Sequence, residues 1–165
     1  MKTLLLIRHA KSSWDVPGQN DFDRPLNDRG KEDAPQMAKR LKDKKIKPDL
    51  FISSPAKRAF RTARYFAEEY DIKKEDIKVD DDLYLATTAA FSKVIENLNN
   101  KYDTVVLFSH NPGITQLANS LTGVRIDNMP TCGIFAVKAD TRDWLDFDTV
   151  EKKFMFFDYP KNPLE

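Results

Sequence analysis

The chain has 165 residues, of which 41% are hydrophobic and 32% are charged. This length and composition fit one globular domain over residues 1–165 and exclude a chain that is largely disordered. The formal net charge of +1 provides no long-range field that would attract nucleic acid or an anionic membrane surface, so we expect neither as a partner.

Short apolar runs alternate along the chain with longer segments of helical periodicity. In chain order the pattern predicts a strand at 4–7, a helix capped by Asn27, a strand at 50–53, a helix at 54–70, a weak strand at 77–79, a helix at 89–98, a strand at 104–109, a helix from Pro112, and strands at 134–137 and 153–157. Such alternation is typical of an α/β domain. We expect a three-layer α/β/α sandwich with a mostly parallel central sheet.

Two of these helices carry local signals at specific residues. Ser54 followed by Pro55 fits an N-cap and the first position of the helix at 54–70. Pro35 lies inside the helix that Asn27 caps, where it removes a backbone hydrogen bond and clashes with the preceding turn. We therefore expect a kink or an interrupted first turn in that helix.

The chain contains one cysteine, Cys132, and two histidines. A single cysteine cannot form an internal disulfide, and with two histidines it cannot supply the four ligands of a usual structural zinc site. We expect no metal, no other cofactor and a reducing compartment. The apolar run near Met1 is too short for a signal peptide, and no later run reaches membrane-spanning length, so the expected location is cytoplasmic.

Four residues whose side chains can bind anions or take part in catalysis follow predicted strands. Arg8 and His9 come directly after the first strand, Arg58 lies in the first turn of the helix after the second, and His110 follows the strand at 104–109. Ligands of open α/β sheets bind at the carboxyl ends of the strands. We therefore expect these four side chains to converge on one edge of the sheet.

These residue types fit an anion site that also contains a nucleophile. The donor fork of an arginine suits phosphate oxygens, and a neutral imidazole held among such donors can attack phosphorus. His9 is the better nucleophile because it lies beside Arg8 at the end of a rigid strand. His110 then donates to the transferring phosphoryl group.

Three spaced motifs resemble the histidine phosphatase superfamily, also called phosphoglycerate-mutase-like. They are Leu-Ile-Arg-His at 6–9, Ser-Ser-Pro-Ala-Lys-Arg-Ala at 53–59 with Thr62-Ala63 after it, and Ser-His-Asn-Pro-Gly at 109–113. The short chain, Arg-His-Ala-Lys-Ser-Ser-Trp-Asp at 8–15 and Asp-Arg-Pro-Leu-Asn-Asp-Arg-Gly at 23–30 resemble the SixA-type phosphohistidine phosphatases. The resemblance implies His9 as the phosphorylated nucleophile, with Arg8, Arg58 and His110 as the phosphate pocket.

The sequence departs from the family pattern at the proton donor. Larger members often carry Asn where this chain has Asp15, and the segment at 83–86, Leu-Tyr-Leu-Ala, has no carboxylate to serve as the usual general acid. The candidate donors are Asp15, Asp21 and Asp23, although Asp15 can be peripheral and the other two can equally brace Arg24. A missing acid favours a phosphoramidate substrate over an ester.

We therefore expect a metal-independent phosphatase with a phosphohistidine intermediate on His9, acting on a phosphohistidine protein domain or a small phosphorylated molecule. The alternatives are a small-molecule phosphomonoesterase or mutase and a non-catalytic adaptor that binds phosphate. Other prominent residues have ordinary interpretations. Trp14 and Trp144 are expected to be packing residues, Cys132 a small apolar one, and Lys57, Arg61 and the basic run at 39–47 solvated.

Overall fold

The computed structural model describes residues 1–163, so the last two residues of the expected domain lie outside the described part. Its six-stranded sheet has the order β3-β2-β4-β1-β5-β6. The strands are β1 (Lys2–Arg8), β2 (Leu50–Ser53), β3 (Lys78–Val79), β4 (Thr104–Ser109), β5 (Ile134–Ala139) and β6 (Lys152–Asp158). Neighbours from β3 to β1 pair in parallel, whereas β5 is antiparallel to both β1 and β6. The predicted α/β fold with a mostly parallel sheet is confirmed.

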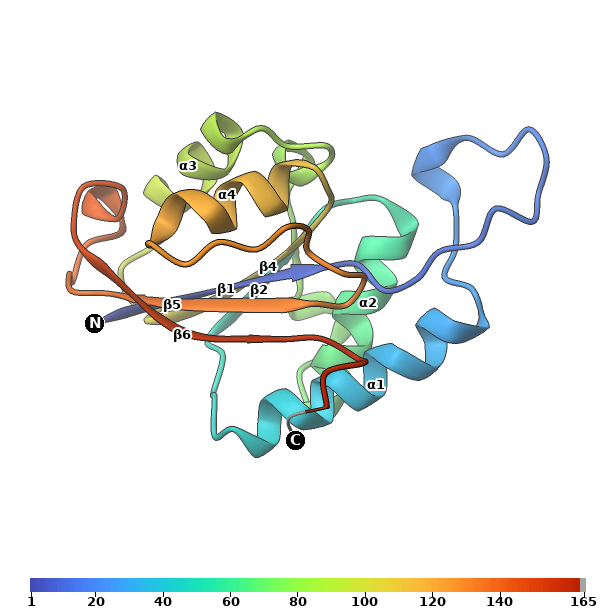
Figure 1. Ribbon diagram of the computed structural model, residues 1–165, viewed down its shortest axis with the longest axis horizontal. Coiled ribbons are helices and arrows are strands. Elements are labelled where there is room, and N and C mark those ends of the chain that lie inside the picture. Colours follow the sequence, from blue (N-terminus) through green and yellow to red (C-terminus); the bar gives the residue numbers. More distant parts are fainter. Residues whose placement is uncertain (164–165) are drawn as a thin grey trace.

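Two pairs of helices cover the two faces of the sheet. Figure 1 shows α3 (Thr88–Glu96) and α4 (Gly113–Leu121) on one side, and α1 (Asp28–Asp43) and α2 (Lys57–Glu69) on the other. The helix α1 runs across Pro35 without the interruption expected of its first turn. Buried Met37, Ala38 and Leu41 hold it against the sheet, and this packing outweighs the local cost of the proline.

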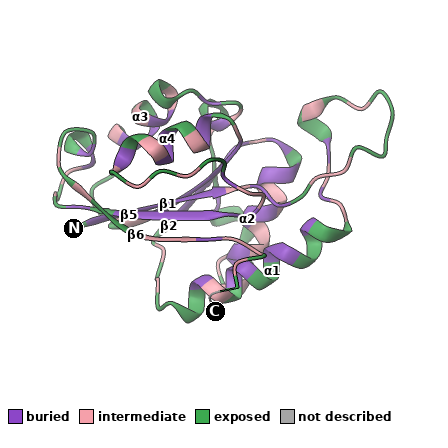
Figure 2. Cartoon of the chain, in the orientation of Figure 1, coloured by how far each residue is buried: buried purple, intermediate pink, exposed green. Residues whose placement is uncertain are grey.

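The central strand β1 is buried on both faces and contributes to two apolar cores. Leu4 and Leu6 belong to the core beneath α3 and α4, whereas Leu5 and Ile7 belong to the core beneath α1 and α2. This division follows from the alternation of side chains along a strand. Figure 2 shows the strands in the centre as buried. Because β1 is packed on both sides, it gives rigid support to Arg8 and His9, the residues that follow Ile7.

A long connection between β1 and α1 projects beyond the end of the sheet (Figure 1). It contains a short 3-10 helix, η1 (Asp21–Asp23), and is largely exposed (Figure 2). Leu26 is buried, and it pairs with Ser12 in an antiparallel bridge that fixes the base of the projection. The connection therefore places its own side chains beside the residues that follow β1.

Residues 1–163 include no helix that is both long enough and apolar enough to cross a membrane.

Candidate active site

The carboxyl ends of β1, β2 and β4 lie at the same edge of the sheet, and a cleft of about 280 Å³ opens beside them. All four residues predicted to converge line this cleft, together with Asp21 from the projecting connection. The complete lining is Arg8, His9, Lys11, Ser12, Trp14, Asp21, Arg24, Arg58, Leu85, His110, Asn111 and Thr131. The topology therefore brings the predicted residues together as the sequence indicated.

The two ring nitrogens of His9 have different hydrogen-bond partners. Its Nδ1 lies 2.8 Å from the carbonyl oxygen of Ala10, and because a carbonyl only accepts, the ring proton is on Nδ1. The lone pair is then on Nε2, which lies 3.3 Å from the donating Nε of Arg58. Burial lowers the pKa of His9 well below its usual value, with added repulsion from His110 and Arg58. The ring is therefore neutral and nucleophilic.

The position of His9 is fixed by backbone hydrogen bonds on either side. Its own N–H continues the pairing of β1 with β4 by donating to the carbonyl of Ser109 at 3.1 Å. The hydroxyl of Thr62 accepts from the N–H of Ala10 at 2.9 Å and donates to the carbonyl of Arg58 at 2.8 Å. Thr62 thus joins the turn after β1 to the helix that carries Arg58.

His110 lies beside His9, with ring centroids 5.2 Å apart, and is oriented by Ser54. The hydroxyl of Ser54 accepts from the N–H of Ala56 at 3.2 Å and is free to donate to Nε2 of His110 at 2.7 Å. When the hydroxyl donates in this way, the neutral ring carries its proton on Nδ1, a buried atom without a partner in the described chain. Such an N–H is suited to donate to a phosphate oxygen.

The bond to His110 also corrects the predicted start of α2. The helix begins at Lys57 with Ala56 as its N-cap residue, not at Ser54. The hydroxyl of Ser54 is engaged with His110 and with the N–H of Ala56, so it does not cap the helix. Ser54 is a residue type typical of N-caps, but here its side chain binds His110 in the site.

Arg58 is 3% exposed and is bound on its outer side by Asp21. Its Nη1 donates to the Asp21 carbonyl at 2.6 Å, and its Nη2 donates to the Asp21 carboxylate at 2.9 Å. Tyr84 donates to the same carboxylate at 2.7 Å. These bonds leave Nε of Arg58 pointing at the reactive nitrogen of His9. Asp21 therefore positions the guanidinium.

Two further arginines that line the cleft have buried nitrogens without partners among residues 1–163. Arg8 donates through Nη1 to the Met129 carbonyl at 2.9 Å, but its Nε has no partner among residues 1–163. Nη1 of Arg24 is also buried and unpartnered within the same range. Like Nδ1 of His110, these N–H groups belong to residues that line the cleft, and an oxyanion bound there is the kind of acceptor that suits them.

Of the three candidate proton donors, only Asp21 lines the cleft. Asp15 lines a separate hollow with Ser13 and Asn27, and Asp23 lines the neighbouring groove described below. Burial opposes ionisation of Asp21, but hydrogen bonds from Tyr84 and Arg58, with the arginine charges, outweigh it and lower the pKa of this carboxyl. Asp21 is therefore held as a carboxylate and has no proton to donate at neutral pH.

Sequence reasoning missed the contributions of Tyr84 and Trp14. Tyr84 packs edge-on against His110, with ring centroids 5.5 Å apart, besides its bond to Asp21. Trp14 was expected to be a packing residue, but it is 78% exposed and lies 3.5 Å from the Arg24 guanidinium at the mouth of the cleft. That expectation is wrong because the projecting connection carries Trp14 away from both cores. Trp144 is fully buried, as expected.

A close approach at Gly113 explains how Tyr84 comes to lie beside His110. A side chain at this first position of α4 would collide with the carbonyl oxygen of Ala86. Glycine therefore allows the segment that contains Tyr84 to pack against the start of α4, directly after His110.

Within the described residues, no group of three or more His, Cys, Asp or Glu side chains is placed to hold a metal ion.

Both histidines are expected to remain neutral throughout the range in which a free histidine titrates. Burial, with the charge of Arg58, lowers the pKa of His110 to about 3, and burial lowers that of His9 as well. Nitrogen-15 NMR of the two imidazoles between pH 5 and 8 should show constant shifts, with the proton of His9 on Nδ1. A protonation midpoint near 6.5 for either ring would contradict this expectation.

The same lowered pKa values predict how stability depends on pH. Below 6.5 the unfolded chain binds protons that the folded chain excludes. The free energy of unfolding should therefore fall as the pH drops from 6.5 toward 3. Urea denaturation at several pH values measures this slope.

Comparison with known proteins places this cleft in a family context. Residues 4–84 match the model of the Histidine phosphatase superfamily (branch 1). A solved structure from Agrobacterium tumefaciens, assigned as a phosphohistidine phosphatase SixA, superposes with a TM-score of 0.80 and 27% identity. The superposition covers 96% of this chain and 98% of that one. The likeness therefore extends over the whole fold.

This chain is also similar to two curated proteins, of which it covers different shares. An uncharacterized chloroplastic protein of Arabidopsis thaliana is 29% identical over 151 residues, which is 87% of this chain and 69% of that protein. Phosphoserine phosphatase 1 of Hydrogenobacter thermophilus is 39% identical over 80 residues, or 46% of this chain and 37% of that enzyme. The second match thus covers well under two thirds of the relative.

Proposed function

Because the chain belongs to the histidine phosphatase superfamily, we propose that it hydrolyses phosphohistidine in a protein through a covalent intermediate on His9. The observation that carries the proposal is the surroundings of the His9 Nε2 lone pair. Nε of Arg58 lies 3.3 Å from that nitrogen, and buried donors of Arg8 and His110 line the same cleft without partners among residues 1–163. This arrangement supports attack on a phosphorus atom whose oxygens these donors hold.

The reaction divides into two displacements at phosphorus. In the first, Nε2 of His9 bonds to phosphorus while the bond from phosphorus to the substrate nitrogen breaks, and the imidazole leaving group departs. The Nδ1–H of His9, bound to the Ala10 carbonyl, stabilises the positive charge that forms on the ring. In the second, water attacks phosphorus, the His9 nitrogen leaves, and a proton passes to solvent as inorganic phosphate forms.

The leaving group decides which substrates this site can process. A phosphohistidine accepts a proton from water on its other ring nitrogen, so a neutral imidazole departs without help from an enzymic acid. An alkyl ester leaves as an alkoxide unless an acid protonates it. Asp21, the one candidate donor in the cleft, is held as a carboxylate by Arg58 and Tyr84. This network favours the phosphoramidate.

The second candidate is a small-molecule phosphomonoesterase or mutase, and the match to phosphoserine phosphatase 1 keeps it in consideration. It requires a proton donor that Asp21 does not provide in this state. A third candidate, a phosphate-binding adaptor, requires no nucleophile. The neutral ring of His9, with its proton held on Nδ1 and its Nε2 lone pair beside Arg58, argues against it.

A comparison of leaving groups tests the proposal. Purified protein should cleave phosphohistidine about 10² to 10⁴ times more efficiently than phosphoserine, because general acid catalysis contributes that factor to ester cleavage. Among aryl phosphates, kcat/KM should fall steeply as the pKa of the phenol rises. Equal kcat/KM values for phosphohistidine and phosphoserine, or a flat aryl series, would replace this proposal by the phosphomonoesterase.

A further inference from the structure

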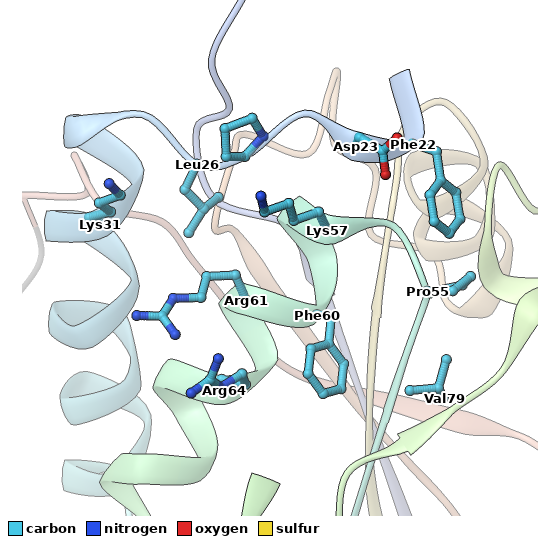
Figure 3. Close-up of a pocket in the computed structure, with 11 residues that line it drawn as sticks. Phe22, Asp23, Leu26, Lys31, Pro55, Lys57, Phe60, Arg61, Arg64 and Val79 are labelled. Atoms are coloured by element: carbon cyan, nitrogen blue, oxygen red, sulfur yellow. The ribbon is translucent and has the colours of Figure 1, made fainter. Parts of the chain in front are cut away.

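We propose that a groove beside the catalytic cleft docks an acidic, partly apolar segment of the phosphorylated protein; this inference rests on the proposed function. The groove has a volume of about 660 Å³, more than twice that of the cleft. Its lining residues are Phe22, Asp23, Pro25, Leu26, Lys31, Pro55, Lys57, Phe60, Arg61, Arg64 and Val79 (Figure 3). None of these residues has a role in the mechanism above.

The groove has a cationic part and an apolar part. Figure 3 shows Arg61 and Arg64 extending from α2 toward α1 and Lys31, while Phe22, Pro55, Phe60 and Val79 gather at the other side. Four cations and one carboxylate, Asp23, are among the lining residues, although the chain as a whole is nearly neutral. This concentration of positive charge is local, so it selects an acidic ligand at short range.

The apolar part remains accessible to a partner. Phe22 is 39% exposed and Val79 is 47% exposed, while the half-buried ring of Phe60 lies between them and the arginines. Phe22 is held edge-on against Tyr84, with ring centroids 5.2 Å apart, so it presents a fixed surface. Exposed apolar side chains rimmed by charge are the usual composition of a protein-binding surface.

The groove and the cleft share a wall. Phe22 lines the groove, while its neighbour Asp21 lines the cleft and binds Arg58. Lys57 likewise lines the groove directly before Arg58, and Pro55 does so directly after Ser54, which binds His110. A protein whose phosphorylated side chain enters the cleft therefore places adjacent surface over the groove.

A polypeptide fits the groove better than a nucleic acid does. Beside the rings of Phe22 and Phe60, the apolar side includes Pro55 and Val79, whose aliphatic surfaces suit the apolar side chains of a polypeptide and offer bases neither hydrogen bonds nor further stacking. Carboxylates on one side of a segment would meet Lys31, Arg61 and Arg64, and apolar side chains on the other would cover the rest. Leu, Ile or Val beside Glu or Asp is the chemistry that the groove selects.

Two synthetic phosphohistidine peptides test the inference. One carries an arm of Glu and Leu residues, and the other carries an arm of Ser and Gly residues. The wild-type protein should show a kcat/KM about 10-fold higher for the acidic arm, the scale of two exposed ion pairs. The preference should shrink as salt is added and should vanish in Arg61→Glu/Arg64→Glu. Because both peptides carry the same phosphate, the ratio of their kcat/KM values cancels any general repulsion of phosphate by the introduced glutamates.

A matched charge reversal and a small substrate serve as controls. Lys93→Glu/Lys153→Glu makes the same change in net charge at exposed positions on α3 and β6, away from the groove, and should keep the preference. Arg61→Gln/Arg64→Gln replaces the first variant if that one fails to fold. Hydrolysis of p-nitrophenyl phosphate reports the His9 chemistry separately, so loss of docking and loss of the proposed function are distinguishable.

Equal kcat/KM for the two peptides in the wild-type protein would overturn the inference, as would an acidic preference that survives in the Arg61→Glu/Arg64→Glu variant. Inhibition by oligothymidylate that depends on the same two arginines would assign the groove to nucleic acid instead.

Discussion

Replacing His9 by alanine is expected to reduce kcat by about 10⁶-fold, the scale of losing a covalent nucleophile. The Nε2 lone pair of His9 is directed into the cleft by the bond from Nδ1 to the Ala10 carbonyl. Alanine supplies no atom that can bond to phosphorus, and the neighbouring ring of His110 is bound through Nε2 to Ser54. Steady-state turnover of phosphohistidine, with and without the substitution, measures the effect.

Trapping the intermediate makes this expectation specific to His9. Brief exposure to ³²P-labelled substrate, followed by denaturation, should leave phosphate on the wild-type chain that is labile to acid and stable to alkali. The His9→Ala variant should carry no such label, whereas His110→Ala should acquire it more slowly than the wild-type chain. Label on another residue of the wild-type chain, or turnover by His9→Ala near the wild-type rate, would refute the mechanism.

The alanine variant must be shown to fold, because His9 is only 5% exposed at the end of β1. Circular dichroism and a cooperative thermal transition serve this purpose. Inorganic phosphate should still raise the transition temperature, since Arg8, Arg58 and His110 remain to bind it. A folded, phosphate-binding and inactive variant separates the lost nucleophile from a lost structure.

Replacing Arg58 by alanine is expected to raise the barrier by about 3 to 4 kcal/mol, or roughly 10² to 10³-fold in kcat. The guanidinium is buried beside the reacting nitrogen, and its Nε donates to Nε2 of His9 in the resting site; when Nε2 bonds to phosphorus, this donor is released to a phosphoryl oxygen, where it stabilises the transition state. The effect should therefore be larger in kcat than in KM. Arg58→Lys should recover only part of the activity, because an ammonium cannot keep the fork that Asp21 holds.

The neighbouring Lys57 provides the matched control for Arg58. It lies one residue earlier on α2, is exposed and lines the groove on the other side of the shared wall. Lys57→Ala should leave hydrolysis of p-nitrophenyl phosphate within about two-fold of wild type, as expected of a surface substitution. If Arg58→Ala and Lys57→Ala were equally active, Arg58 would have no place in the transition state.

The sequence was sufficient for the elements that depend on local pattern and on topology. Strand lengths, helical periodicity and the order of motifs predicted the α/β fold and the mostly parallel sheet that the structure contains. They also located Arg8, His9, Arg58 and His110 at one edge, because the carboxyl ends of parallel strands lie together. No knowledge of side-chain distances was needed for that conclusion.

Features that depend on a specific distance between remote segments came only from the tertiary structure. Ser54 has the composition of a helix cap, and only the position of β4 beside β2 brings it within 2.7 Å of His110. From the sequence, Asp21 was one of three candidate proton donors; its bonds to Arg58 and Tyr84, 37 and 63 residues away, set its charge. A pKa depends on such neighbours and on burial.

Surface residues show most clearly the difference between what the local sequence predicts and what the tertiary structure decides. From the sequence, Arg61 is a solvated cation and Trp14 a packing residue, because each interpretation uses only nearby residues. In the structure, Trp14 is 78% exposed beside Arg24, and Arg61 lines a groove formed by α1, α2 and the projecting connection. Local chemistry predicted a phosphate site at the strand ends. The packing of distant segments decided which groups are charged, which are exposed, and what surface lies next to the site.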